Sequence, residues 1–153
     1  MGFVFGSLSK IIYENSYSKP YSWLLDPIVV NCYGKEMPED EVLIAIDYWR
    51  SNGESIGFYE HNPPKSVCSN ESIMGFIILR KAGFNQFDSK TLASTRRYTS
   101  LTEIKSSVIW FSKGSYNLDL LIEHELGHAL GYAHVEEEGN IMHPIYEFIG
   151  ENF

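Results

Sequence analysis

Apolar positions along the chain fall into short blocks, and the spacing within each block predicts either a strand or a helix. Residues 28–32 form an apolar run of strand length that ends at a polar turn containing Gly34. The next block, residues 38–51, begins with a proline followed by acidic residues, which suits the positive end of a helix. Its apolar residues recur at helical spacing and predict a helix that packs on the core. These positions are Val42, Leu43, Ile46 and Trp49.

The remaining blocks predict more strands and a second helix. The predicted strands are residues 55–59, 73–79, 91–95 and 107–112. A second helix follows, with Ser115 or Asn117 as its expected N-terminal cap and Asp119 in its first turn. This order predicts an α+β fold with a mixed twisted sheet of about five strands and two main helices packed on it. The residues beyond Pro144 leave room for a short C-terminal helix of about two turns.

Length and composition exclude several classes of protein. The chain has 153 residues, of which 44% are hydrophobic and 21% charged, and this fits one globular domain with its own core. We expect residues 1–22 to form an N-terminal strap over a single domain of residues 23–153. No apolar run reaches the roughly 18 residues that a membrane span needs. The formal net charge of −8 argues against a nucleic-acid surface. We expect a monomer.

The sequence leaves the compartment of the protein open. The apolar residues 1–9 precede the first basic residue, Lys10, whereas a signal peptide carries its charge before the apolar run. Secretion would rest on family analogy alone. Cys32 and Cys68 either form a disulfide or remain free thiols, and the sequence does not decide between these states.

The strongest chemical signal is a cluster of three histidines and one glutamate. His124 and His128 are four residues apart, so on a helix both rings leave the same face, with Cβ atoms about 5–6 Å apart. That spacing suits two nitrogens that bind one zinc ion at about 2.0–2.1 Å. Glu125 points about 100° away from His124 and can hold a water beside the metal without being a ligand. A helix stop at Gly131 lets the chain turn back and bring in His134 as the third ligand.

The pattern His-Glu-x-x-His-x-x-Gly-x-x-His that these residues form resembles the zinc signature of the metzincin metallopeptidases. Members of that family also carry a methionine turn beneath the metal, and residues 140–144, Asn-Ile-Met-His-Pro, are similar to it. Met142 follows His134 at a spacing that most resembles the matrixin branch. The resemblance implies a metzincin-like (zincin) fold, in which one edge strand of the mixed sheet is antiparallel.

The resemblance also implies a function, that of a zinc-dependent endopeptidase. One zinc ion, held by His124, His128 and His134, would activate a water for attack on the peptide bond, with Glu125 as general base. Met142 would form an apolar floor beneath the three rings. The expected partner is a protein or peptide substrate. Calcium is left open, because acidic residues are plentiful but no calcium-loop motif is present.

Two short segments resemble the substrate-binding parts of matrixins. Residues 91–95 are similar to the edge strand along the matrixin cleft, where an extended peptide can add as a further strand. A plain edge strand without a ligand is the alternative. The segment after Met142 resembles the wall of the pocket for the residue after the cut bond, which implies an apolar residue there. The candidate substrate-binding residues are Leu92, Ala93, Ser94, Pro144, Ile145 and Tyr146.

Other interpretations stay open. The chain could be a catalytically inactive zinc-containing binding module, or a structural protein in which zinc holds the C-terminal half together. Glu125 favours the enzyme, because peptide hydrolysis needs this carboxylate and metal binding does not. Beyond the three proposed ligands only His61 and His143 remain, so we do not expect the second zinc site of matrixins, which uses three histidines and an aspartate. We expect His61 in a solvated loop and His143 at the cleft rim.

Overall fold

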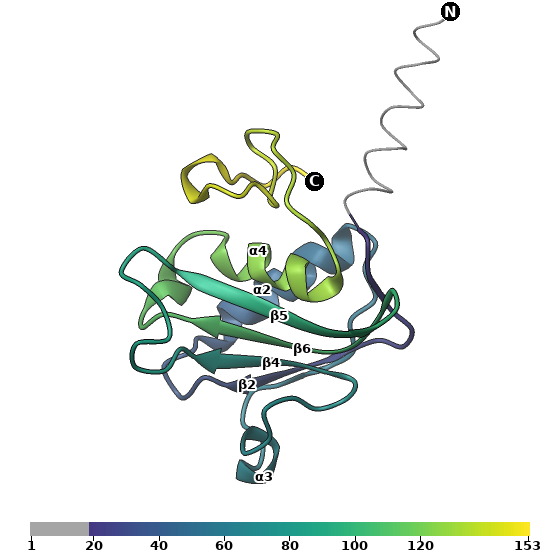
Figure 1. The fold of residues 1–153 in the computed structure, drawn as a ribbon, viewed down its shortest axis with the longest axis vertical. Helices are drawn as coiled ribbons and strands as arrows, with labels where there is room; N and C mark the ends of the chain where they lie inside the picture. Colours follow the sequence, from purple (N-terminus) through teal and green to yellow (C-terminus); the bar gives the residue numbers. More distant parts are fainter. Residues whose placement is uncertain (1–18) are drawn as a thin grey trace, which may run out of the picture.

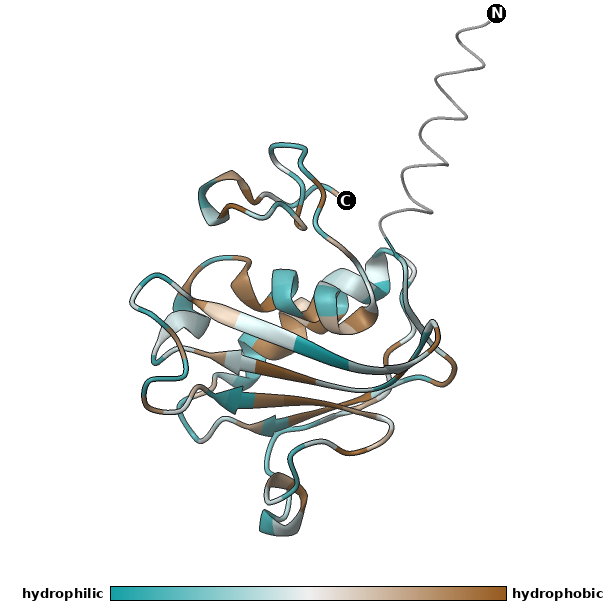
Figure 2. Cartoon of the chain, viewed as in Figure 1, coloured by the Kyte–Doolittle hydropathy of each residue, from teal (hydrophilic) through white to brown (hydrophobic). Residues whose placement is uncertain are grey.

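The central strands of the sheet are the most apolar elements of the protein. The computed structural model describes residues 19–153, in which a six-stranded sheet has the order β1-β6-β4-β2-β3, with β5 also paired to β6 (Figure 1). β2 (Ile28–Cys32), β4 (Phe76–Lys81) and β6 (Glu103–Phe111) are paired in parallel. Figure 2 shows hydrophobic residues along the middle of these strands, as expected for parallel strands that are covered on both faces.

The edge strands are shorter or more polar. β5 (Ala93–Ser100) is antiparallel to β6, which confirms the mixed sheet with one antiparallel edge strand. β5 continues well past the predicted segment, residues 91–95. The continuation was not predicted because the second half of the strand is polar and half-exposed, which is typical of a loop. The strand predicted over residues 55–59 is reduced to β3 (Tyr59–Glu60), and β1 (Ser22–Trp23) was not predicted.

Two helices lie over the same side of the sheet (Figure 1). They are α2 (Glu39–Ser51) and α4 (Leu121–Leu130), and their buried side chains join those of the strands in one core cluster. Trp49 of α2 is fully buried, and its indole N–H donates a hydrogen bond of 2.7 Å to the carbonyl of Glu123 in α4. Its ring also stacks on Tyr132, with centroids 5.0 Å apart. This contact fixes α4, which carries the histidines, against α2.

The N-terminal end of α4 differs from the prediction. Neither Ser115 nor Asn117 caps it, because both belong to a separate 3-10 turn, η1 (Ser115–Asn117). The capping position is Leu120, which has a left-handed backbone (φ 65°) and no side-chain capping bond. The expected short C-terminal helix is a single 3-10 turn, η2 (Tyr146–Phe148), rather than two helical turns.

A disulfide answers the question that the two cysteines left open. Cys32 at the end of β2 pairs with Cys68 at the end of α3 (Lys65–Cys68), with Cα atoms 5.4 Å apart. The bond ties the loop between β3 and β4 to the sheet on the side away from α4 (Figure 1). The short helix α3 lies between the predicted strands at residues 55–59 and 73–79, where the sequence predicted neither a helix nor a strand.

The predicted N-terminal strap falls mainly on residues 1–18, which lie outside the described residues. The part that is described, residues 19–22, packs on the domain: Lys19 forms an ion pair of 2.8 Å with Glu54, and the backbone N–H of Ser22 donates to the carbonyl of Thr102 at 3.0 Å. Within residues 19–153, no helix has the length and apolar character needed to cross a membrane.

Candidate active site

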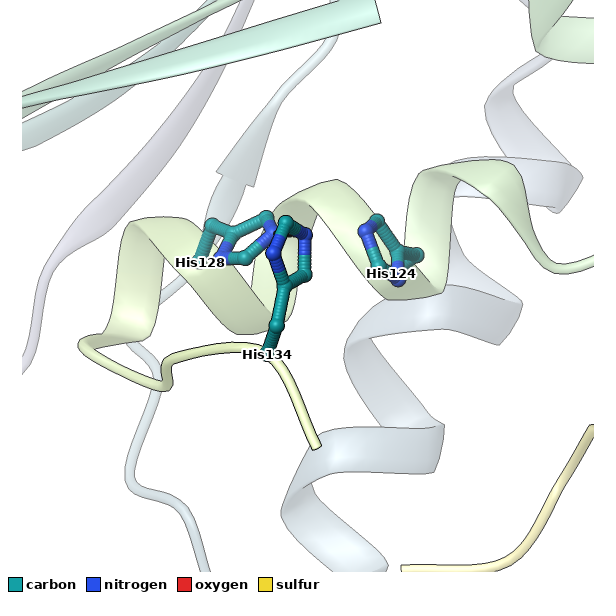
Figure 3. Close-up of side chains that lie close together, drawn as sticks. All are labelled: His124, His128 and His134. Atoms are coloured by element: carbon teal, nitrogen blue, oxygen red, sulfur yellow. Dashed lines mark hydrogen bonds between the residues drawn. The ribbon is translucent and has the colours of Figure 1, made fainter. Parts of the chain in front are cut away.

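Helix α4 and the turn that follows it bring the three histidines together (Figure 3). His124 and His128 leave the same face of the helix. Gly131 then ends the helix with a left-handed backbone (φ 119°), and the chain turns back to place His134 opposite the other two rings. Only glycine fits at residue 131 for two reasons: other residues rarely adopt this left-handed backbone, and a Cβ would collide with the backbone carbonyl of Tyr21.

The histidine nitrogens converge on one point. A potential ligand nitrogen from each ring lies within 4.8 Å of the others, and the Nε2 atoms of His128 and His134 are 3.1 Å apart. Two nitrogens bound to one tetrahedral zinc at 2.0–2.1 Å would be roughly 3.3–3.4 Å apart. The separation of His128 and His134 is therefore close to that of two ligands of a single ion.

Hydrogen bonds on the opposite sides of the rings set their orientation. Nδ1 of His124 lies 2.7 Å from the carbonyl of Ile141, and Nδ1 of His128 lies 2.9 Å from the carbonyl of Tyr132. A carbonyl accepts only, so each Nδ1 carries the proton and each Nε2 keeps its lone pair for a metal. Burial lowers the pKa of His124 to about 4 and that of His128 to about 3, so both rings are neutral at pH 7. Burial also lowers the pKa of His134, and a set of three neutral imidazoles with this geometry fits zinc.

Glu125 lies beside this cluster with one oxygen held and the other available. Its Oε1 accepts a hydrogen bond of 2.6 Å from the hydroxyl of Thr95 on β5, and its Oε2 lies 4.0 Å from Nε2 of His124. The side chain is buried, which raises the pKa of Glu125 to about 7, although the Thr95 bond lowers it in part. A carboxyl group that titrates near neutrality can both take and release a proton at working pH.

The methionine turn packs against the two segments that carry the histidines, because the carbonyl of Ile141 lies 2.7 Å from Nδ1 of His124 and the turn is hydrogen-bonded to Val135. Met142 is fully buried, and its backbone N–H donates to the side chain of Asn140 at 2.8 Å. Its carbonyl accepts from Val135 at 2.9 Å, which ties the turn to the segment that carries His134. A Cβ at Gly127 of α4 would lie 2.5 Å from the sulfur of Met142, so the glycine allows the helix to approach the turn.

A cleft of about 830 Å³ runs along the edge of β5 and past the histidines. Five of the six predicted substrate-binding residues line it, together with the three histidines and Glu125. Those five are Leu92, Ala93, Ser94, Pro144 and Tyr146. Ile145 is not among the lining residues and is half-exposed beside the turn.

Several other lining residues were not predicted. Thr95 and Arg97 point into the cleft from β5 and contact Glu125 and His128. The sequence signal for them is only the alternation of a strand, with every second residue after Ala93 on one face. Lys90 and Glu147 also line the cleft.

The two remaining histidines do not join the site. His143 is buried, not at the cleft rim as predicted, and its Nδ1 accepts a hydrogen bond of 3.0 Å from the N–H of Ile145. Its ring packs edge-on against Phe148, so the side chain stabilises the turn. His61 is half-buried, with Nδ1 2.7 Å from the hydroxyl of Tyr59.

The fold and the histidine cluster together define a metzincin-like catalytic domain. A mixed sheet with one antiparallel edge strand packs against the helix that carries His124 and His128, and His134 follows in the turn after that helix. Comparison with known families agrees. The family model described as matrixin, a family of peptidases, matches residues 34–153. The chain therefore belongs to the matrixin family, whose members are metalloproteases that use zinc.

Proposed function

We propose that this protein is a zinc-dependent endopeptidase. The observation that carries the proposal is the convergence of three neutral histidines beside a carboxylate, on the wall of a cleft bordered by an open strand edge. Family membership supports zinc and proteolysis in general. The proposal goes further, because it assigns catalysis to this chain and gives each residue a role.

His124, His128 and His134 would hold the zinc ion. When bound, zinc acts as a Lewis acid that polarises the scissile carbonyl and makes water more acidic. The hydrogen bonds from His124 to Ile141 and from His128 to Tyr132 keep the rings in place, so the site does not have to reorganise on binding the metal.

Glu125 is the proton carrier in this proposal. Thr95 holds Oε1, which leaves Oε2 to accept a proton from the attacking water and to deliver it later to the nitrogen of the leaving amine. Burial raises the pKa of Glu125 in the metal-free protein, and a bound zinc ion would favour the carboxylate, the form that accepts a proton from water.

The substrate would bind as an added strand on β5. This strand pairs with β6 on one side only among residues 19–153, so its other edge offers backbone N–H and C=O groups to an extended peptide. Leu92, Ala93 and Ser94 would hold the peptide there. Pro144 and Tyr146 would form the wall for the residue after the cut bond, and Tyr146 is fixed by a hydrogen bond of 2.8 Å to the carbonyl of Asp119.

Cleavage of a proteome-derived peptide library, with and without a zinc chelator, tests the proposal. We expect cleavage by the zinc-loaded protein, loss of cleavage with chelator, and recovery when zinc is added back. The cut sites should share an apolar residue after the broken bond. If the zinc-loaded protein leaves the whole library intact, the chain is a binding or structural module and not an enzyme.

A further inference from the structure

Arg97 places a positive charge in the cleft without a carboxylate partner among residues 19–153. Its side chain lines the cleft, and none of the ion pairs in the described part of the chain includes it. The guanidinium is half-buried and lies over the ring of Tyr21, with the central carbon 4.9 Å from the ring centroid. Charged groups removed from water are normally paired, so an unpaired guanidinium in a cleft is poised for an anionic ligand.

One contact of Arg97 is structural, but it uses little of the side chain. Its Nη1 donates a hydrogen bond of 2.8 Å to the carbonyl of His128, near the C-terminal end of α4. That carbonyl already accepts from the N–H of Gly131 at 3.0 Å, so the helix end is satisfied without the arginine. A guanidinium has five N–H donors, and most of those on Arg97 remain for another partner.

The position of Arg97 along β5 fixes where that partner would be. Arg97 follows Thr95 by two residues on the same face, which is about 6.6–6.8 Å along a strand. Thr95 contacts Glu125, so Arg97 lies about one strand repeat from the proposed reacting centre. Arg97 also contacts His128, near the C-terminal end of α4, whereas Tyr146, in the wall proposed for the residue after the cut bond, contacts Asp119, just before the N-terminal end of α4. Arg97 therefore faces residues before the cut bond.

We propose that Arg97 binds a carboxylate of the substrate and makes the cleft select peptides with an aspartate or glutamate shortly before the cut bond. The proposal rests on the endopeptidase function proposed above. The net charge of the chain, −8, would repel acidic peptides in general. A preference for them must therefore come from a local site, and a guanidinium matches a carboxylate with two parallel hydrogen bonds.

Matched peptides that differ only in glutamate or glutamine test this selection. The parent peptide is the best-cleaved sequence from the library, and each of the three positions before its cut bond is occupied in turn by glutamate and by glutamine. At one position we expect the wild-type protein to cleave the glutamate peptide with kcat/KM about tenfold higher or more, because a hydrogen bond between charged groups is stronger than one to an amide. In Arg97→Gln this ratio should fall to about one.

Arg96→Gln is the control. This substitution removes the same charge from the neighbouring position. The side chain of Arg96 is exposed, does not line the cleft, and lies over the ring of Tyr98. The glutamate-to-glutamine ratio should be unchanged in this variant. A ratio compares two peptides with one protein sample, so a partly unfolded variant does not alter it.

Three results would overturn the proposal: a wild-type ratio near one at all three positions, a ratio that survives in Arg97→Gln, or an equal loss in Arg96→Gln. The wild-type ratios can overturn the proposal by themselves, even if Arg97→Gln does not fold. Failure of the endopeptidase proposal is a separate result, because no peptide of either kind would then be cleaved.

Discussion

The hydroxyl of Thr95 on the edge strand donates a hydrogen bond of 2.6 Å to Oε1 of Glu125, the carboxylate next to the first histidine. The same hydroxyl also lies 3.2 Å from the backbone carbonyl of Glu125. One small side chain thus connects the strand expected to hold the substrate with the group expected to move the proton. Thr95 acts on the reaction through Glu125, so it is a positioning residue.

Replacing Thr95 by valine, which has a similar shape and no hydroxyl, should lower kcat and leave KM nearly unchanged. A hydrogen bond to a charged group contributes about 1.5–3 kcal/mol, which corresponds to roughly tenfold or more in rate. Steady-state kinetics on a peptide substrate measures both parameters. Thr95→Ser keeps the hydroxyl and should restore kcat. If serine is as slow as valine, the hydrogen bond does not position Glu125.

Substituting Gly127 by alanine should destabilise the protein, although alanine is the better helix former. The new Cβ would lie 2.5 Å from the sulfur of Met142 and 2.5 Å from a ring carbon of Trp49, both fully buried. Overpacking of this kind costs about 1–3 kcal/mol. Urea unfolding of the metal-free protein measures the change without a contribution from zinc. Gly83→Ala is the control, since its Cβ would meet only a side-chain atom at 3.6 Å. Equal stability of Gly127→Ala and wild type would contradict the close approach of α4 to the methionine turn.

Removal of the disulfide should lower stability and spare activity. The bond joins residues 36 apart in sequence, and a loop of that length contributes about 3–4 kcal/mol in the chain-entropy treatment. The Cys32→Ser, Cys68→Ser double variant should therefore unfold at lower urea concentration. Its kcat/KM, measured where it is fully folded, should match the wild type because α3 lies on the far side of the sheet from α4 (Figure 1). A large loss of kcat/KM in the folded variant would show that the loop between β3 and β4 supports the cleft.

Chelation should abolish cleavage without unfolding the domain. The core cluster is formed mainly by residues of the sheet, α2 and α4, together with Tyr132, Ile141 and Met142 from the segment after α4, and it does not include the three histidines. Circular dichroism should therefore change little when zinc is removed, while thermal stability falls by an amount that depends on zinc concentration. A chain that loses its helical signal together with the metal would instead use zinc as a structural ion.

The clustering of the three histidines and the order of elements could be predicted because both depend on local properties of the sequence. The spacing of His124 and His128, the glycine stop at Gly131 and the return to His134 lie within one helix and one turn. The helix over residues 38–51 was predicted in the same way, whereas the methionine turn was identified by its resemblance to the metzincin family. In the structure the nitrogens of the three histidines converge, and α4 ends at Gly131, as the residue spacing predicted.

Features that depend on contacts between distant segments could not be predicted. The pairing of Cys32 with Cys68 requires the loop after β3 to fold back on β2. Arg97 follows the predicted strand residues in a polar stretch, and only the pairing of β5 with β6 shows that it faces the cleft. The N-terminus of α4 was mispredicted because Leu120 adopts a left-handed backbone where a polar cap was expected.

Comparison of the wild type with Glu125→Gln for both zinc content and peptide cleavage tests whether a zinc site and the carboxylate beside it together hydrolyse peptides. Glutamine keeps the shape of Glu125 and cannot accept the proton, and Glu125 is not one of the three ligands. We predict one zinc per chain in both proteins and a loss of kcat of at least about 100-fold in the variant. Cleavage by zinc-loaded Glu125→Gln at the wild-type rate, or a wild-type chain that binds no zinc, would contradict the account.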